Sequence, residues 1–143
     1  MKVMEMLDSK GREVVTTQAE VTIEGIVRLL RARNIGAVVV LEADGGIAGL
    51  LSERDVVRAL ALHGQRALSM RVGEVMTRDL QTCGTGDDCR ALMSLMTEHR
   101  VRHLPVVEDG RLAGIISIGD VVKQRLAEIE SEADTLREYI TAR

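Results

Sequence analysis

Aliphatic residues follow two spacings along the chain, one typical of strands and one typical of helices. Residues 35–41 form a β-branched run, which predicts a strand covered on both faces. Residues 47–51 predict the return strand, because the Asp44-Gly45-Gly46 sequence before them is a hairpin turn signal. From Thr22 onward the apolar residues recur every three or four positions, which predicts an amphipathic helix that stops near Asn34.

The same order of elements begins again in the second half of the chain. Residues 80–82 resemble the short strand candidate 14–16, and residues 87–99 predict a helix like the one after Thr22. Strand candidates at 101–107 and 112–116 then follow, so the repeat period is about 65 residues. Each copy is predicted to contain a strand, a helix, two strands and a helix. One sheet face would stay bare in a single copy, so the two copies are expected to pack on each other.

Pro105 lies inside one of these strand candidates. Proline has no N–H to donate to a neighbouring strand, so this residue predicts an edge position or the start of the strand.

Each copy closes with the same motif, in which a Ser follows an aliphatic run and an Asp stands three residues later. The motif begins at Gly49 in the first copy and at Gly114 in the second. The Ser is suited to an N-cap, and the Asp lies in the first helical turn, where the helix dipole favours a carboxylate. These residues are Ser52 and Asp55 in the first copy and Ser117 and Asp120 in the second. Capping explains each copy alone, but recurrence at one spacing favours a ligand role.

The last predicted helix is longer than its counterpart in the first copy and carries a regular apolar seam. Its spacings alternate between four and three, which is a heptad pattern. The seam residues are Val122, Leu126, Ile129, Ala133, Leu136 and Ile140. The helix could pack back on its own chain, but the regularity of the seam favours a homodimer.

Composition narrows the function classes. The chain of 143 residues has 45% hydrophobic residues but no Phe, no Trp and a single Tyr, so the core is aliphatic. Aromatic stacking platforms are missing and the net charge is −3, which together argue against a nucleic-acid partner. No apolar run approaches the roughly 20 residues of a membrane helix, and the start lacks the apolar block of a signal peptide. We therefore expect a cytoplasmic protein with no membrane partner.

The duplicated unit resembles the cystathionine-β-synthase (CBS) domain, and two such domains in tandem form a Bateman module. The resemblance is carried by Gly-aliphatic-aliphatic-Ser-x-x-Asp in both copies, and by residues 101–107 followed by 109–114. It covers nearly the whole chain apart from the tail after about Ala127. The implied fold is α/β (α+β), with two β-α-β-β-α repeats packed with pseudo-two-fold symmetry and an extended C-terminal helix. The implied domains are repeat 1 with its lead-in helix at 1–66, repeat 2 at 67–127, and a helical extension at 128–143.

The resemblance implies a regulatory module and not an enzyme. CBS pairs bind adenosine-containing ligands such as AMP, ADP, ATP, NAD or S-adenosylmethionine in clefts between the repeats, and no cofactor is required. A chain with no other domain looks like a stand-alone sensor that acts through a homodimer on an unidentified protein target.

The resemblance also implies roles for individual residues. Asp55 and Asp120 would accept hydrogen bonds from ribose hydroxyls, and bonds to a charged acceptor are the strong ones. The hydroxyls of Ser52 and Ser117 would face ribose or phosphate. The short first strands would each place a hydroxyl near the ligand, from Thr16 (or its neighbour) in one copy and from Thr82 in the other.

Phosphate contacts are expected to differ between the copies. Arg102 and His103 occupy the family position where basic side chains meet phosphates, whereas the first copy has Gly36 and Ala37 there. The alternative for the basic pair is a solvated strand edge. Unequal ligand sites follow if the pair binds phosphate.

The adenine ring needs a flat apolar slot between aliphatic faces. The expected lining residues are Ile35, Leu51, Val101 and Ile116. Backbone groups around Gly36-Ala37 and His103-Leu104 would contact the edge of the base. The alternative is that all four lining residues are ordinary core.

Two other functions remain open from the sequence. One is a dimeric scaffold whose sites bind nothing, although such a protein has no need to keep both Asp residues. The other is a redox or metal responder that uses Cys83 and Cys89. Their spacing with the histidines fits no compact zinc pattern, so no metal site is expected.

Overall fold

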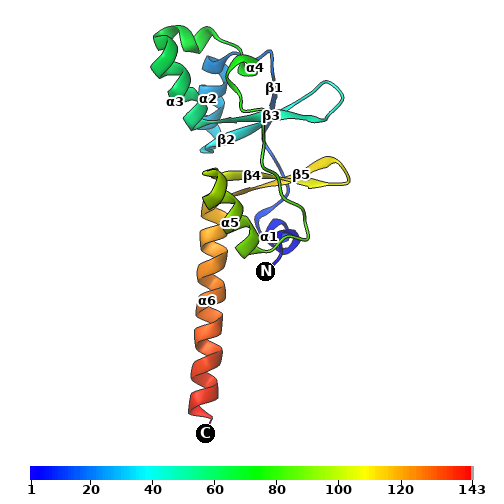
Figure 1. Ribbon diagram of the computed structural model, residues 1–143, viewed down its shortest axis with the longest axis vertical. Helices are drawn as coiled ribbons and strands as arrows, with labels where there is room; N and C mark the ends of the chain where they lie inside the picture. Colours follow the sequence, from blue (N-terminus) through cyan, green and yellow to red (C-terminus); the bar gives the residue numbers. More distant parts are fainter. Residues whose placement is uncertain (143) are drawn as a thin grey trace. The chain divides into compact units, whose positions relative to one another are not determined.

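The computed structural model, which describes residues 1–142, divides into two units that draw on different parts of the chain. Unit 1 comprises Met1–Arg12, Gln81–Glu108 and Ala113–Arg143, and unit 2 comprises Glu13–Leu80 and Asp109–Leu112. Figure 1 labels the helices and strands of both units. The mixed α/β content and the two repeats agree with the fold predicted from the sequence.

Unit 2 contains the strands and helices of the first repeat. Its elements are β1 (Thr16–Gln18), α2 (Ile23–Arg33), β2 (Ala37–Leu41), β3 (Ile47–Ser52), α3 (Glu53–His63), the 3₁₀ helix η1 (Gly64–Ser69) and α4 (Val72–Val75). The sheet order is β1-β2-β3, with β1 parallel and β3 antiparallel to β2. The predicted hairpin turn joins β2 to β3, and the Gly46 N–H donates to Asp44 Oδ1 over 2.9 Å.

Unit 1 contains the helices of the second repeat together with the first helix of the chain. Its elements are α1 (Val3–Lys10), α5 (Cys89–His99), β4 (His103–Glu108), most of β5 (Arg111–Ser117) and α6 (Ile118–Thr141). The strands β4 and β5 form a two-stranded sheet. The predicted C-terminal extension is the continuous end of α6, and only Arg143 of that prediction lies outside the described residues.

Helix α2 begins and ends where the sequence predicts. Thr22 is its N-cap, and the Thr22 Oγ1 accepts a hydrogen bond from the N–H of Gly25 over 3.3 Å. Asn34 ends the helix in the left-handed conformation with φ 53°, which an asparagine adopts more easily than most residues. In the second repeat, Asp88 caps α5, so the helix starts slightly later than residue 87.

The first strand of each repeat differs from the prediction. Residues 14–16 were the expected strand in the first copy, and β1 instead covers Thr16–Gln18. In the second copy, residues 80–82 form no strand, and the pairing is reduced to one parallel bridge between Cys83 and Val106.

Pro105 explains the shortened pairing in the second repeat. In the first repeat the N–H of Val39 donates to the carbonyl of Val15 over 3.3 Å, beside the Thr17–Val40 pair. Pro105 occupies the place of Val39 in the second repeat and has no N–H, so this ladder bond cannot form. The outer edge of β4 therefore carries a single bridge in place of a strand.

Each unit has its own aliphatic core. In unit 2 the fully buried side chains come from the sheet, α2 and α4, and include Ile23, Val38 and Leu51. In unit 1 they come from α1, α5 and the sheet, and include Leu7, Leu92 and Ile116. None of the helices in residues 1–142 is both long and apolar enough to cross a bilayer.

The segments that lead into the two repeats are exchanged in space. Helix α1 precedes the first repeat in sequence but packs in unit 1, on the elements of the second repeat. Helix α4, which precedes the second repeat, packs in unit 2 on the elements of the first. The domain boundaries proposed from the sequence describe the order of the repeats along the chain, and these two units describe their packing.

The glycine that begins each motif is the place where a lead-in segment crosses the return strand. A Cβ on Gly114 would lie 2.6 Å from Cδ2 of Leu7 in α1. A Cβ on Gly49 would lie 2.6 Å from the carbonyl oxygen of Thr77 and 2.9 Å from Sδ of Met76, at the end of α4. Real Cβ atoms do not come this close, so a side chain at either glycine would force a neighbouring group to move.

Candidate functional site

The two Ser-x-x-Asp motifs fold into the same local structure. Asp55 Oδ2 accepts a hydrogen bond from the N–H of Ser52 over 2.9 Å, and Ser52 Oγ accepts one from the N–H of Asp55 over 3.4 Å. The corresponding distances for Asp120 and Ser117 are 2.8 and 3.2 Å. Each pair is a capping box that starts α3 or α6. Capping is thus the observed local role, and it also fixes the direction of each carboxylate.

In unit 2 the carboxylate of Asp55 is enclosed. The side chain is 7% exposed, and its Oδ1 accepts a hydrogen bond from the Thr77 hydroxyl over 3.0 Å. The Oδ2 atom also accepts from Ser52 Oγ over 3.1 Å. The guanidinium of Arg58 lies 3.9 Å from Oδ1, and the Arg58 side chain is mostly exposed. Both oxygens of this carboxylate therefore have donors within the unit.

In unit 1 the carboxylate of Asp120 is more open and carries a cation. Its side chain is 28% exposed, four times the value for Asp55. The Lys10 ammonium, from the end of α1, bonds to Asp120 Oδ2 and donates to the carbonyl of Ile115 over 2.8 Å. Burial acts to raise the pKa of Asp120, but hydrogen bonds from Lys10 and from the Ser117 backbone outweigh it, so the pKa lies below its usual value. This carboxylate is ionised at neutral pH.

Sequence reasoning missed Thr77 and Lys10. Lys10 is the last residue of α1, and Thr77 follows shortly after α4. The similarity of these two lead-in segments is visible in the sequence at 3–7 and 72–76. The linear pattern does not show that each lead-in contacts the other repeat. Only the exchanged packing brings a hydroxyl to one Asp and an ammonium to the other.

Backbone bonds bring the start of a middle strand beside each motif. The N–H of Glu53 donates to the carbonyl of Gly36 over 3.0 Å, and Ala37 pairs with Ser52 in the sheet. In unit 1 the N–H of Ile118 donates to the carbonyl of Arg102 over 2.8 Å. The residues proposed for phosphate and base contacts therefore lie next to the Ser of their own repeat.

The remaining predicted site residues take different positions. Leu51, Leu104 and Ile116 have no exposed surface and belong to the cores, Leu51 in unit 2 and the others in unit 1. Ile35 and Val101 are half-buried and pack against those same two cores. The residues expected to line the adenine slot therefore pack as ordinary core. Their contact with an adenine ring stays a prediction.

The hydroxyl and phosphate candidates lie nearer to solvent. Thr16, Thr82 and Arg102 are exposed, and His103 is half-buried. The three exposed side chains are accessible to a ligand. The backbone of Thr16 is paired in the sheet, and the carbonyl of Arg102 accepts from Ile118.

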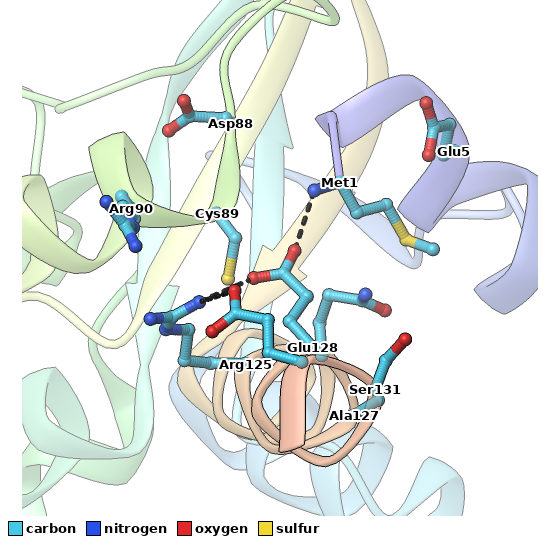
Figure 2. Close-up of a pocket in the computed structure, with 11 residues that line it drawn as sticks. Met1, Glu5, Asp88, Cys89, Arg90, Arg125, Ala127, Glu128 and Ser131 are labelled. Atoms are coloured by element: carbon cyan, nitrogen blue, oxygen red, sulfur yellow. Dashed lines mark hydrogen bonds and ion pairs between the residues drawn. The ribbon is translucent and has the colours of Figure 1, made fainter. Parts of the chain in front are cut away.

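A separate cavity of about 620 Å³ lies in unit 1 between α1, α5 and α6 (Figure 2). Its lining residues are Met1, Glu5, Asp88, Cys89, Arg90, Gln124, Arg125, Ala127, Glu128, Ser131 and Glu132. The amino group of Met1 lies 2.6 Å from one oxygen of Glu128, and Arg125 lies 3.1 Å from the other. The hydrogen bond from the amino group holds the pKa of Glu128 below its usual value. The Met1 amino group and Arg125 both pair with Glu128, and none of the predicted ligand residues lies here.

The two cysteines are free and buried. Burial raises the pKa of Cys83 to about 12, and burial also raises the pKa of Cys89. A thiol with a raised pKa is a poor nucleophile and metal ligand, because the thiolate is the reactive form. Within the part of the chain that the structure describes, no cluster of three or more His, Cys, Asp or Glu residues is placed to hold a metal.

Comparison with known proteins gives a consistent result. The family model described as CBS domain matches residues 10–62 and 72–127. The CBS domain-containing protein CBSX3 of Arabidopsis thaliana, a mitochondrial protein, is 31% identical over 96% of this chain and 71% of its own length. The CBS-domain protein ATU1752 of Agrobacterium tumefaciens is 48% identical, with a TM-score of 0.86 over 87% of this chain and 99% of that chain.

A more distant neighbour was solved with ligands. The CBS domain pair of protein MJ0100, in complex with 5′-methylthioadenosine and S-adenosyl-L-methionine, is 21% identical with a TM-score of 0.79. It covers 90% of this chain and 98% of that chain. At this identity the likeness concerns the fold alone.

Proposed function

The chain belongs to the CBS domain family, and from this premise we propose that it is a regulatory module that binds adenosine-containing nucleotides and signals through a homodimer. The observation that carries the proposal is the pair of matching Ser-x-x-Asp motifs, each with an oriented carboxylate at a strand-to-helix junction. The complex of MJ0100 with two adenosine-containing molecules supports this choice of ligand class.

The ribose is the part of the ligand that these carboxylates suit best. Two vicinal hydroxyls can donate to one ionised carboxylate, which has acceptor sites for several hydrogen bonds. Asp120 offers the more accessible carboxylate because it is more exposed than Asp55. At Asp55 a ribose would have to share or displace the hydrogen bond from Thr77. We therefore assign the stronger nucleotide site to the motif of the second repeat.

Charge separates the two sites further. Lys10 and Arg102 both lie beside the motif of unit 1, and Lys10 already contacts its carboxylate. The corresponding strand start in unit 2 has Gly36 and Ala37, and its lead-in contributes the neutral Thr77. In this proposal the site at Asp120 prefers phosphorylated ligands such as AMP, ADP, ATP or NAD, and the site at Asp55 takes a nucleoside or stays empty.

The proposed role is binding and not catalysis. The chain would be a cytoplasmic sensor that needs no resident cofactor and has no nucleic-acid or membrane partner. Binding can regulate a protein target only if the nucleotide has different affinities for two arrangements of the module.

One observation favours a non-binding scaffold as the second candidate. Both oxygens of Asp55 already accept hydrogen bonds from its own unit, so a purely structural role accounts for this residue. The same explanation is weaker for Asp120, whose side chain is more exposed and is bonded to a cation at the surface.

A thermal-shift panel tests the proposal against the scaffold. The wild-type chain is melted with AMP, ADP, ATP, NAD and S-adenosylmethionine, and with inorganic phosphate as the matched anion control. A ligand at one hundred times its Kd stabilises the folded state by about 2.7 kcal/mol, so at least one adenosine-containing ligand should raise the Tm while phosphate does not. An unchanged Tm with every nucleotide would contradict the sensor and favour the scaffold.

A further inference from the structure

Helix α6 has two faces with different surroundings. Val121 is fully buried against unit 1, and Gln124, Arg125 and Glu128 on the same face are half-buried. An adjacent face, about 100° further round the helix, holds aliphatic side chains that are between 46% and 61% exposed, namely Val122, Leu126, Ile129, Leu136 and Ile140. The C-terminal half of the helix projects beyond the other elements of its unit (Figure 1). Within the described residues, this apolar face is not covered by unit 1.

The exposed face is the heptad seam of α6, which we define as residues 122, 126, 129, 133, 136 and 140. In coiled-coil notation Leu126, Ala133 and Ile140 occupy a positions, and Val122, Ile129 and Leu136 occupy d positions. Helix α6 has 24 residues, so it is about 36 Å long and can present the whole seam to one partner helix. We propose that this seam pairs with the same seam of a second copy of the chain, in parallel and in register.

The charges beside the seam fit a parallel pair. Position g of one helix faces position e of the next heptad on its partner, five residues later. Glu132 would therefore meet the partner's Arg137, a contact between opposite charges that occurs twice in a symmetric dimer. Arg125, at the preceding g position, is half-buried and already pairs with Glu128 of its own unit over 3.1 Å. Glu132 and Arg137 are 67% and 79% exposed, so both side chains are accessible to a partner helix.

An antiparallel pair places like charges together. In that arrangement e positions face e positions and g positions face g positions, while each a residue faces a d residue. Glu130 and Glu132 would then face the same residues of the partner, and Lys123 would face the partner's Arg137. Like charges at these positions destabilise a coiled coil, so the flanking residues select the parallel direction.

The same pattern identifies the occupant as a second copy. Glu132 and Arg137 of one copy would pair with Arg137 and Glu132 of a second copy, because the two residues are five positions apart. A surface for an unrelated helix does not require this self-complementarity. This inference rests on the homodimer of the proposed function and deepens it, because it names the surface that pairs and the direction of pairing.

Disulfide trapping in the full-length chain tests the direction. In a parallel, in-register pair, residue 136 faces residue 136 of the partner at a d position, so Leu136→Cys should form a disulfide-linked dimer under mild oxidation. Glu138→Cys, on the outer f position of the same helical turn, is the matched control and should stay monomeric on a non-reducing gel. The native Cys83 and Cys89 are buried and do not compete.

Two results would overturn the proposal. One is that the 136 and 138 variants cross-link equally, or that neither variant cross-links. The other is preferential cross-linking between Leu126→Cys on one chain and Leu136→Cys on the other, which is the contact of an antiparallel pair.

A charge swap gives an independent measurement of direction. With Ile129→Cys as the cross-linking site, Arg137→Glu should lower the yield of disulfide-linked dimer several-fold, because Glu132 then faces a carboxylate of the partner. Adding Glu132→Lys should restore the yield. In an antiparallel pair residue 129 would face residue 133 of the partner, and Arg137→Glu would face Lys123 and stabilise the pair. A yield of the 129 cross-link that Arg137→Glu leaves unchanged or raises would therefore contradict the proposal.

The failure of this inference can be told apart from the failure of the proposed function. Cross-linking is measured without nucleotide, and nucleotide binding is measured by melting. Cross-linking at position 136 without any nucleotide shift would support the coiled coil and contradict the sensor. A rise in Tm with nucleotide but no cross-linking at position 136 would support the sensor and contradict the coiled coil.

Discussion

At the scale of residues, two carboxylates with the same backbone setting differ in their partners. The capping box orients Asp55 and Asp120 alike. From the lead-in segments, however, Asp55 accepts a hydrogen bond from the Thr77 hydroxyl, whereas Asp120 accepts one from the Lys10 ammonium. The spacing of Ser and Asp was enough to predict both carboxylates and their place at a helix start. The partners Thr77 and Lys10 could not be predicted, because they arrive through packing of segments that are remote in sequence.

The ion pair between Lys10 and Asp120 predicts a pH-dependent contribution to stability. Because the pKa of Asp120 is lowered in the folded chain, the contribution is fully present above the ordinary aspartate pKa of 3.8 and is lost as the pH falls through the lower folded value. Lys10→Met should therefore reduce the free energy of unfolding by about 0.5–1 kcal/mol at pH 7, since the pair is partly exposed. The difference from wild type should shrink in denaturant titrations below pH 4.

Arg12→Met is the matched control for that experiment. Arg12 pairs with Asp8 on the surface, and both side chains are well exposed. A loss of stability as large as that of Lys10→Met, or a Lys10→Met difference that does not depend on pH, would contradict the role assigned to the pair.

At the scale of elements, most helices and strands could be predicted from apolar spacing, caps and turn residues. The boundaries of α2 followed from Thr22 and Asn34. The strand predicted at residues 80–82 of the second repeat was wrong, because its pairing needs a hydrogen bond that Pro105 of the neighbouring strand cannot donate. Pro105 was the available signal. It predicted an edge position or a strand start, but it did not show which hydrogen bond the neighbouring strand would lose.

The crossing of each lead-in over a return strand predicts unequal costs for two glycine substitutions. Gly49→Ala places a Cβ 2.6 Å from a backbone carbonyl, which cannot move without shifting the chain. Gly114→Ala places its Cβ 2.6 Å from the end of the Leu7 side chain, which can change rotamer. Both should destabilise by about 1–3 kcal/mol, with the larger loss at Gly49, as measured by thermal unfolding.

Gly86→Ala serves as the control, because a Cβ there meets no atom within 4 Å. Equal stabilities of the three alanine variants would show that the lead-in segments do not cross the strands as described.

At the scale of the whole molecule, the fold carries two repeats but does not make them equivalent. The sequence could predict the duplication, because the same motif recurs in the same order of elements. The exchange of α1 and α4 between the repeats could not be predicted, since both lead-ins have similar apolar patterns and either could pack on either repeat. That exchange gives unit 1 a cation at its carboxylate, and the long α6, which follows β5, belongs to the same unit.

Calorimetric titration of AMP into the wild-type chain and Asp120→Asn is the most direct measurement of the central claim. Asparagine keeps an oxygen that can accept from the Ser117 N–H, so the cap survives while the charge is lost. Hydrogen bonds to a charged group contribute about 1.5–3 kcal/mol, so the substitution should weaken AMP binding by roughly 10- to 100-fold. Asp55→Asn should have a smaller effect. Undiminished AMP affinity in Asp120→Asn, or no binding by the wild type, would contradict a nucleotide site at this motif.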